Sequence, residues 1–214
     1  AGKVGGYKLV DAPVIAQVHG GPINHFRAGY DGVAQFLANR GYVVFQSNFR
    51  GSTGFGLDYV FAPKGDYGNG RVQQDIVEGV HWLLAQGIGD AERVGIVGHS
   101  FGGYSTLLGL TFQPDLFKVG VAGSPPADLG WSMRWLLKSG DQGDLPDRSL
   151  QQTLRALSLD ATDAATRARL HAQSPQANAA GCIGRYAPAQ EDLNKRGDYK
   201  AGGLYAPGVA DTTP

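Results

Sequence analysis

The sequence has few of the residues that build crosslinked, cysteine-ligated or strongly charged proteins. Cys182 is its only cysteine, so no disulfide can form within the chain and no cysteine-based metal site can assemble. A single cysteine fits a reducing compartment without excluding the periplasm. Charged residues make up only 18% of the chain, and its 19 basic and 19 acidic side chains cancel. No long-range field would therefore draw the protein to nucleic acid or to a membrane surface, and neither partner class is expected.

Long hydrophobic runs are also missing from the sequence. No apolar stretch approaches the roughly 20 residues of a membrane-spanning helix, and the N-terminus lacks the basic-then-apolar pattern of a secretion signal. The first residue is alanine rather than methionine, which is compatible with a start further upstream. The 214 residues suffice for one α/β domain with a buried core and are few for two.

Glycine, by contrast, is abundant and occupies 33 of 214 positions. Most of these glycines flank short apolar runs, which indicates tight turns in the first two thirds of the chain. Four such runs, rich in valine and isoleucine, predict parallel strands covered on both faces, because none of them alternates cleanly. The runs are Val14–Val18, Tyr42–Gln46, Val94–Val97 and Val119–Ala122.

Helical patterns separate the predicted strands and continue after the last of them. The three between or beside the strands are Gly32–Asn39, Val72–Gln86 and Tyr104–Phe112, and two short surface helices are predicted at Ser149–Leu157 and Ala161–His171. Asp160 and Asp163 supply capping groups for the last helix. Alternating strands and helices predict right-handed crossovers and a doubly wound, mostly parallel α/β sheet.

The strongest functional signal is a G-x-S-x-G pattern made by Gly98, Ser100 and Gly102. It lies between an apolar run and a predicted helix, which is the context of a nucleophile elbow. The sharp turn that exposes such a serine tolerates only small neighbours, because backbone passes close by. The helix N-terminus behind the serine stabilises negative charge on a substrate carbonyl oxygen. A chance match in a glycine-rich chain is the alternative, which the flanking strand and helix disfavour.

A second motif, H-G-G-P at residues 19–22, follows the first predicted strand. Adjacent glycines let backbone N–H groups approach a substrate oxygen, as in an oxyanion hole. The expected donors are the N–H of Gly20 or Gly21 and the N–H of Phe101. His19 is expected to end the strand and orient this loop. A plain β-turn is the alternative.

Four segments, taken in order, give the chain a resemblance to a known family. They are V-H-G-G-P at 18–22, Q-F-L-A-N-R-G-Y-V-V at 35–44, N-F-R-G-S-T-G-F-G at 48–56 and G-H-S-F-G-G-Y at 98–104. Together they resemble the catalytic domain of the prolyl oligopeptidase family of serine peptidases, nearest to its acylaminoacyl- and dipeptidyl-peptidase-like bacterial members. The resemblance covers roughly Val14 to Ser174. The first and third segments separate this family from lipases and esterases, which share only the elbow.

The resemblance implies an α/β-hydrolase fold and hydrolysis of short peptides through an acyl-enzyme on Ser100, with no metal or organic cofactor. Cleavage in this family often follows proline or releases N-terminal residues. A β-propeller usually precedes the hydrolase domain and restricts access to short substrates, and none is expected here. An aromatic wall of the substrate pocket is implied after the fourth strand, where Trp131 and Trp135 lie four residues apart. Packing of both tryptophans in the core or under a loop is the alternative.

Arg50 follows the second predicted strand, at the edge where doubly wound sheets build their sites. It is a candidate for steering a peptide carboxylate. Pairing of Arg50 with Asp66 or Asp75 is the favoured interpretation.

The acid and base that should accompany Ser100 are not identifiable in the sequence. In α/β-hydrolases the order is Ser, then Asp or Glu, then His. The only histidine after Ser100 is His171, which falls in a predicted helix, and the elbow directs His99 away from its neighbour. Residues 1–180 are therefore expected to form a partial hydrolase domain without its last strands, and residues 181–214 an irregular tail. A frameshift, a fusion or a truncated fragment would each explain the break.

Three functional hypotheses follow. A serine peptidase is favoured by the motifs, whereas a carboxylesterase of the same fold is not. A non-catalytic or truncated remnant with a preserved peptide pocket would account for the missing acid and base.

Overall fold

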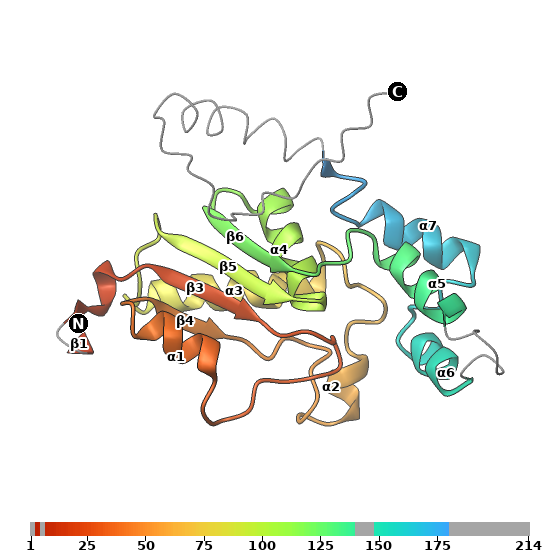
Figure 1. The fold of residues 1–214 in the computed structure, drawn as a ribbon, viewed down its shortest axis with the longest axis horizontal. Coiled ribbons are helices and arrows are strands. Elements are labelled where there is room, and N and C mark those ends of the chain that lie inside the picture. The colour runs from red at the N-terminus through yellow and green to blue at the C-terminus, as the bar shows by residue number, and fades with distance from the viewer. Residues whose placement is uncertain (1–2, 5–6, 140–147, 180–214) are drawn as a thin grey trace.

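The computed structural model describes residues 3–4, 7–139 and 148–179. Its centre is a four-stranded parallel sheet in the order β4-β3-β5-β6 (Figure 1). The strands are β3 (Val14–Val18), β4 (Val43–Gln46), β5 (Val94–His99) and β6 (Val119–Gly123). Each of the four predicted apolar runs forms one of these strands. Since the chain winds outward from β3 to both sides, the sheet is doubly wound, as in an α/β-hydrolase.

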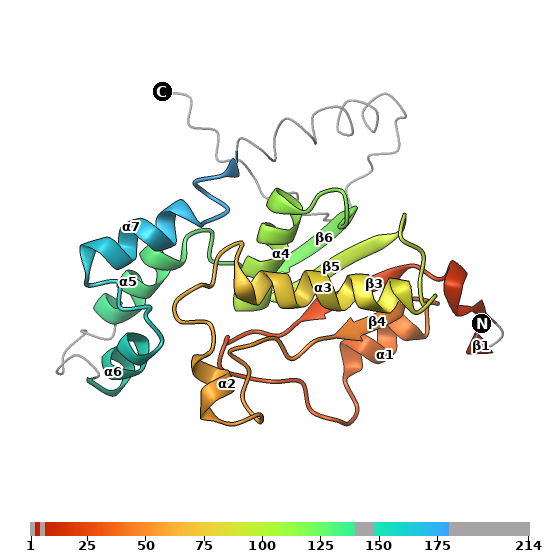
Figure 2. The same ribbon diagram turned by 180° about the vertical axis from the view of Figure 1, so that it is seen from behind.

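Helices surround the sheet and extend beyond the carboxyl ends of its strands. They are α1 (Gly32–Ala38), α2 (Leu57–Phe61), α3 (Arg71–Ala85), α4 (Phe101–Phe112), α5 (Leu129–Ser139), α6 (Arg148–Ala156) and α7 (Ala164–Ala172). α3 lies across one face of the sheet, as Figure 2 shows, and α1 lies on the other face beside β4. At the N-terminus, β1 (Lys3–Val4) and β2 (Tyr7–Lys8) pair antiparallel and precede the short 3₁₀ helix η1 (Leu9–Asp11).

The core lies mainly between the sheet and α3 and α4. The stripe predicted on α3 is buried there and includes Val72, Ile76 and Val80. α4 is buried on almost every side, which is why it carries apolar and small residues throughout. Its first residue is Phe101, so the helix begins three residues earlier than predicted and follows Ser100 directly.

The two helices predicted as surface elements, α6 and α7, are mostly exposed as expected, but leucines in and beside them pack into the core. Leu154, Leu157 and Leu170 are buried in the hydrophobic core cluster. α7 begins at Ala164, because Asp163 caps it by accepting a 2.7 Å hydrogen bond from the N–H of Thr166. These helices therefore form part of the packed domain.

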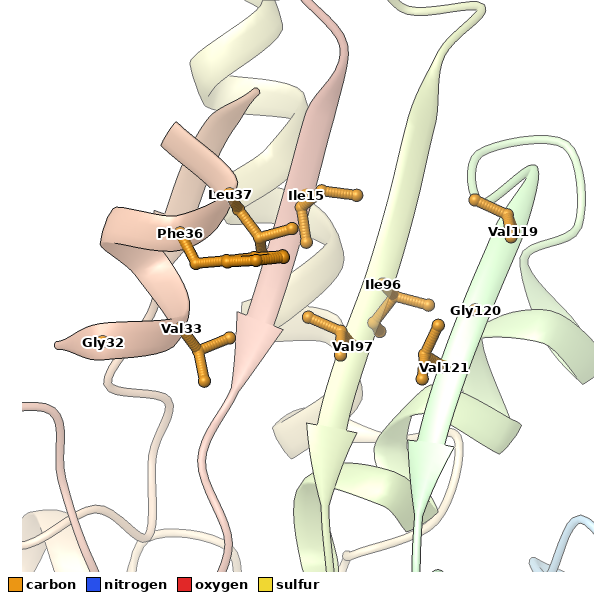
Figure 3. A pocket seen from close by; sticks show the side chains of 10 residues that line it. All are labelled: Ile15, Gly32, Val33, Phe36, Leu37, Ile96, Val97, Val119, Gly120 and Val121. Carbon is orange, nitrogen blue, oxygen red and sulfur yellow. The ribbon is translucent and has the colours of Figure 1, made fainter. Parts of the chain in front are cut away.

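The outer face of the sheet over β6 is open, so the prediction of strands covered on both faces is wrong there. Val119 and Val121 are 50% and 56% exposed. Between α1 and the strands lies an apolar hollow of about 560 Å³ (Figure 3). Its lining comes from α1, β3, β5 and β6 and includes Phe36, Ile15, Val97 and Val121. Among the described strands, β6 and β4 form the two edges of the sheet.

The predicted irregular tail at 181–214 lies outside the described residues. Among the helices that the structure describes, none is both long enough and apolar enough to cross a membrane.

Candidate active site

Ser100 occupies the turn between β5 and α4, at the carboxyl end of the sheet. Its backbone has φ 56° and ψ −119°, a conformation that a residue with a side chain adopts only where the surroundings hold it. The Ser100 N–H donates a 2.8 Å hydrogen bond to the carbonyl of Gly123 in β6, and the Ser100 carbonyl accepts one of 2.9 Å from the N–H of Tyr104. The turn is therefore fixed from the sheet and from the helix, and Ser100 is exposed at its tip.

Two glycines of the motif make this turn possible. A Cβ atom on Gly98 would lie 2.3 Å from the carbonyl carbon of Gly102, and a Cβ on Gly102 would lie 2.1 Å from the carbonyl oxygen of Val18. Neither position has room for a side chain, since the contacting atoms belong to the backbone. The spacing of the motif thus follows from the approach of α4 to the ends of β3 and β5.

The H-G-G-P loop lies beside Ser100. A Cβ atom on Gly20 would be 3.6 Å from the Cβ of Ser100. Within the described part of the chain, the N–H groups of Gly20, Gly21 and Phe101 donate to no hydrogen-bond acceptor. Three free donors therefore belong to the loop beside Ser100 and to the residue that follows it.

His19 is buried under this loop, where its ring contacts two aromatic side chains and both ring nitrogens have hydrogen-bond partners. Its ring stacks on Phe49, with centroids 4.3 Å apart, and meets the edge of Phe26 at 5.3 Å. Nδ1 lies 2.8 Å from the carbonyl oxygen of Gly20, and Nε2 lies 2.8 Å from Oγ of Ser52. Because a carbonyl can only accept, Nδ1 carries the proton and Nε2 accepts from the Ser52 hydroxyl. Burial lowers the pKa of His19, so the ring is neutral at pH 7.

Further hydrogen bonds join the loop after His19 to the N-F-R-G-S-T-G-F-G segment. The N–H of Thr53 donates to the carbonyl of Asn24 at 2.9 Å, and Oγ1 of Thr53 lies 2.7 Å from Nδ1 of His25. The side-chain amide of Asn48 bonds both the N–H and the carbonyl of Phe26, at 2.8 Å and 3.1 Å. Two motifs that are separate in the sequence are thus neighbours in the fold.

Arg50 pairs with Asp75 of α3, as the favoured interpretation expected. Its Nε and Nη2 donate to the two oxygens of the Asp75 carboxylate at 2.7 Å and 2.5 Å, and its backbone N–H adds a third bond of 2.8 Å. The hydrogen bond to Asp75 raises the pKa of the guanidinium. Asp66 instead accepts from the N–H of Arg71.

Trp131 and Trp135 lie on α5, and both are exposed, at 66% and 58%. Their alternative placement in the core is therefore wrong. Trp131 lines a cavity of about 390 Å³ together with Pro125, Asp128 and Ser132. Trp135 is not part of that lining.

No described residue forms a hydrogen bond with the Ser100 hydroxyl. A Cβ atom on Gly123 would lie 3.0 Å from the His99 ring, which therefore lies against β6. Nδ1 of His171 lies 2.6 Å from Oδ2 of Asp128, a pair that sequence reasoning missed because nothing local links positions 43 apart. Neither member of this pair bonds to Ser100.

In the described ranges, no three potential metal ligands gather into a site.

Comparison with known proteins gives a consistent result. The sequence pattern of the prolyl oligopeptidase family matches residues 28–159. The chain is 48% identical over 121 residues to dipeptidyl aminopeptidase BIII of Pseudoxanthomonas mexicana, covering 56% of this chain and 17% of that protein. It is 39% identical over 127 residues to dipeptidyl peptidase family member 6 of Caenorhabditis elegans, covering 59% and 17%. The chain thus spans about a sixth of the length of these relatives.

Solved structures show the same relationship. The acylaminoacyl peptidase of Pyrococcus horikoshii superposes with a TM-score of 0.62 and 29% identity, covering 77% of this chain and 25% of that one. A puromycin-hydrolysing peptidase of Mycobacterium tuberculosis superposes with a TM-score of 0.63 and 27% identity, covering 80% and 24%.

Proposed function

The chain belongs to the prolyl oligopeptidase family of serine peptidases, and from that premise we propose that Ser100 is its catalytic nucleophile. The N–H of Phe101 and that of Gly20 or Gly21 hold the oxyanion that forms when Ser100 attacks a peptide carbonyl. One observation carries this proposal: an exposed serine with φ 56° at a strand-to-helix turn, bordered by N–H groups that have no acceptor among the described residues.

The reaction proceeds through an ester. Oγ of Ser100 bonds to the carbonyl carbon, the C–N bond breaks, and the amine leaves with a proton; water then hydrolyses the acyl-enzyme. The serine proton needs a base, and the described residues place none on Ser100. Residues 14–139 and 148–179 therefore supply the proposed nucleophile and oxyanion donors but no identified acid and base. Enzymes stripped of triad members retain roughly 10³–10⁴-fold acceleration, and this is the activity we expect of the chain by itself.

Short peptides that lose an N-terminal unit are the proposed substrates. Relatives named dipeptidyl aminopeptidase BIII and acylamino-acid-releasing enzyme support this class. Trp131 offers an aromatic wall at the 390 Å³ cavity, with Trp135 one turn further along α5. Arg50 serves the structure rather than the substrate, since Asp75 engages its guanidinium.

A peptide-binding remnant is the second candidate function. It is favoured by the lack of a base in contact with Ser100 among the described residues. A carboxylesterase has no comparable support, because the matched relatives are peptidases.

Labelling with a fluorophosphonate tests the proposal. We expect slow modification that maps by mass spectrometry to Ser100, disappears in Ser100→Ala, persists in the control Ser132→Ala, and is slowed by short peptides. Peptide binding without any labelling would establish the remnant instead. Labelling that survives in Ser100→Ala would exclude Ser100 as the nucleophile.

A further inference from the structure

We propose that Ser124, the residue that follows β6, is a further substrate-binding residue of this site. Its hydroxyl accepts a hydrogen bond from the backbone N–H of the peptide residue on the acyl side of the cleaved bond. This inference rests on the proposed function and deepens it, because it adds a contact for the substrate beside the proposed nucleophile Ser100.

Ser124 lies next to Ser100 across two neighbouring strands. β5 and β6 run parallel with His99 opposite Gly123, so the two serines are the next residues of their strands (Figure 1). The N–H of Ser100 donates at 2.8 Å to the carbonyl of Gly123, which is bonded directly to the nitrogen of Ser124. Both serines are exposed. Since β3 lies on the other side of β5, Ser124 and the H-G-G-P loop flank Ser100 from opposite sides.

The backbone of Ser124 is strained. Its φ of 44° lies in the left-handed region, which residues with a Cβ atom rarely adopt and in which glycine and asparagine are the usual residues. The next residue is Pro125, and a proline favours extended backbone at the position before it. A serine in this conformation costs free energy, and such costs gather at functional sites.

α4 fixes the chain on both sides of Ser124. A Cβ atom on Gly103 would lie 2.8 Å from the carbonyl oxygen of Gly123 and 3.2 Å from the Cβ of Pro125. The helix therefore packs directly against the residues before and after Ser124. Its position is set before a ligand arrives, which lowers the entropy that binding would lose.

Strain alone does not indicate a site, as Ser158 shows. It is also exposed and has φ 58°. However, its N–H donates to the carbonyl of Arg155 at 2.9 Å, and the N–H of Leu159 donates to the carbonyl of Leu154 at 2.7 Å, a pattern that ends a helix with a left-handed residue. Ser124 follows a strand instead. Among the described residues, no hydrogen bond closes a turn across it, and its hydroxyl has no partner.

The cavity beside Trp131 begins at the residue after Ser124, because Pro125 and Trp131 both line it. The proposed function places a substrate side chain against Trp131 and the reacting carbonyl carbon at Oγ of Ser100. The α-carbon and backbone nitrogen of the acyl-side residue connect these two points, and this backbone passes Ser124. A serine oxygen accepts hydrogen bonds, so the hydroxyl of Ser124 is a partner for the N–H of that residue.

Calorimetric titration with two peptides tests this contact. One is alanyl-phenylalanyl-alanine amide, and the other carries a methyl group on the phenylalanine nitrogen in place of the hydrogen. The wild type should bind the unmethylated peptide about fivefold more tightly, and Ser124→Ala should bind both alike. Ser158→Ala is the matched control, because it changes a serine of similar φ at a helix end, and it should keep the difference. An equal difference in Ser124→Ala and the wild type would overturn the proposal.

Ser124→Gly separates the hydroxyl from the backbone conformation. Glycine adopts a positive φ without a steric penalty, so this variant should unfold at a higher urea concentration than Ser124→Ala. It should nevertheless bind the two peptides alike, since it also lacks the hydroxyl. If Ser124→Gly recovers the preference for the unmethylated peptide together with stability, the backbone rather than the hydroxyl is responsible, and the proposal is overturned.

The contact and the proposed nucleophile fail separately. Fluorophosphonate labelling of Ser100 needs no peptide, and peptide binding needs no reaction at Ser100. A wild type that is labelled but binds neither peptide at millimolar concentrations, or binds both equally, would overturn the role of Ser124 and leave the nucleophile in place. A wild type that prefers the unmethylated peptide through Ser124 and is never labelled would support the contact and exclude the nucleophile.

Discussion

Nδ1 of His171 donates a 2.6 Å hydrogen bond to Oδ2 of Asp128 and thereby ties α7 to the start of α5. The other oxygen of Asp128 accepts from the N–H of Trp131 at 3.1 Å and caps α5. One buried carboxylate thus holds two helices beyond the sheet. This contact holds the segment after β6 together.

The two bonds of Asp128 predict unequal losses of stability. Asp128→Ala removes a helix cap and the bond to His171 and should lower the free energy of unfolding by about 2 kcal/mol. His171→Ala removes only one bond from a half-exposed ring and should cost about 1 kcal/mol. Urea denaturation measures both, and equal losses in the two variants would contradict the dual role of Asp128.

Arg50 is expected to act on stability rather than on substrate. Its side chain and that of Asp75 are only partly exposed, at 31% and 20%, and the contact is bidentate. Arg50→Lys cannot reproduce that geometry, so unfolding should become easier by about 1 kcal/mol. Protection of Ser100 against labelling by a short peptide should not change. Lost protection at unchanged stability would make Arg50 a substrate contact.

Burial of His19 predicts a dependence of stability on pH. Burial lowers the pKa of His19 in the folded protein below the ordinary 6.5, so the unfolded chain binds a proton more readily. The contribution is complete above pH 6.5 and is lost as the pH falls from 6.5 through the folded value. Urea midpoints should therefore decline less steeply with falling pH in His19→Gln than in the wild type. Identical slopes would show that His19 does not carry this dependence.

The open face of β6 predicts self-association. Val119 and Val121 are half exposed on an edge strand, where unpaired backbone groups can bind another strand. Replacing both by lysine should reduce light scattering at high concentration while changing the free energy of unfolding by no more than about 0.5 kcal/mol. Val14→Lys, at a fully buried position of β3, is the destabilising comparison. If the variant with lysine at both Val119 and Val121 scatters light as strongly as the wild type, the association uses another surface of the protein.

The strands and the elbow could be predicted because their signals are local. Each strand is a short valine-rich run, and the G-x-S-x-G spacing reflects contacts between backbone atoms a few residues apart. α2 was not predicted, because five residues do not show a helical period. The surface position of α6 and α7 was predicted, whereas the burial of Leu154 and Leu170 was not, since both stand among polar residues.

The contacts that organise the site join residues distant in the sequence. His19 and Ser52 are 33 positions apart, and Asp128 and His171 are 43 apart. Serine, aspartate and histidine are common surface residues, so only the fold reveals which of them are buried partners. The free N–H groups of the H-G-G-P loop were expected from its two glycines, whereas the carbonyl contact beneath them was not.

The pH dependence of fluorophosphonate labelling at Ser100 tests most directly whether an exposed elbow serine with oxyanion donors reacts here without a histidine base. Between about pH 6 and 9 the rate should rise by about tenfold per pH unit without levelling off, because solvent hydroxide takes the proton. The same profile should be absent in Ser100→Ala. A plateau above about pH 7 would reveal a histidine acting on Ser100, and no labelling at any pH would show that Ser100 is not a nucleophile.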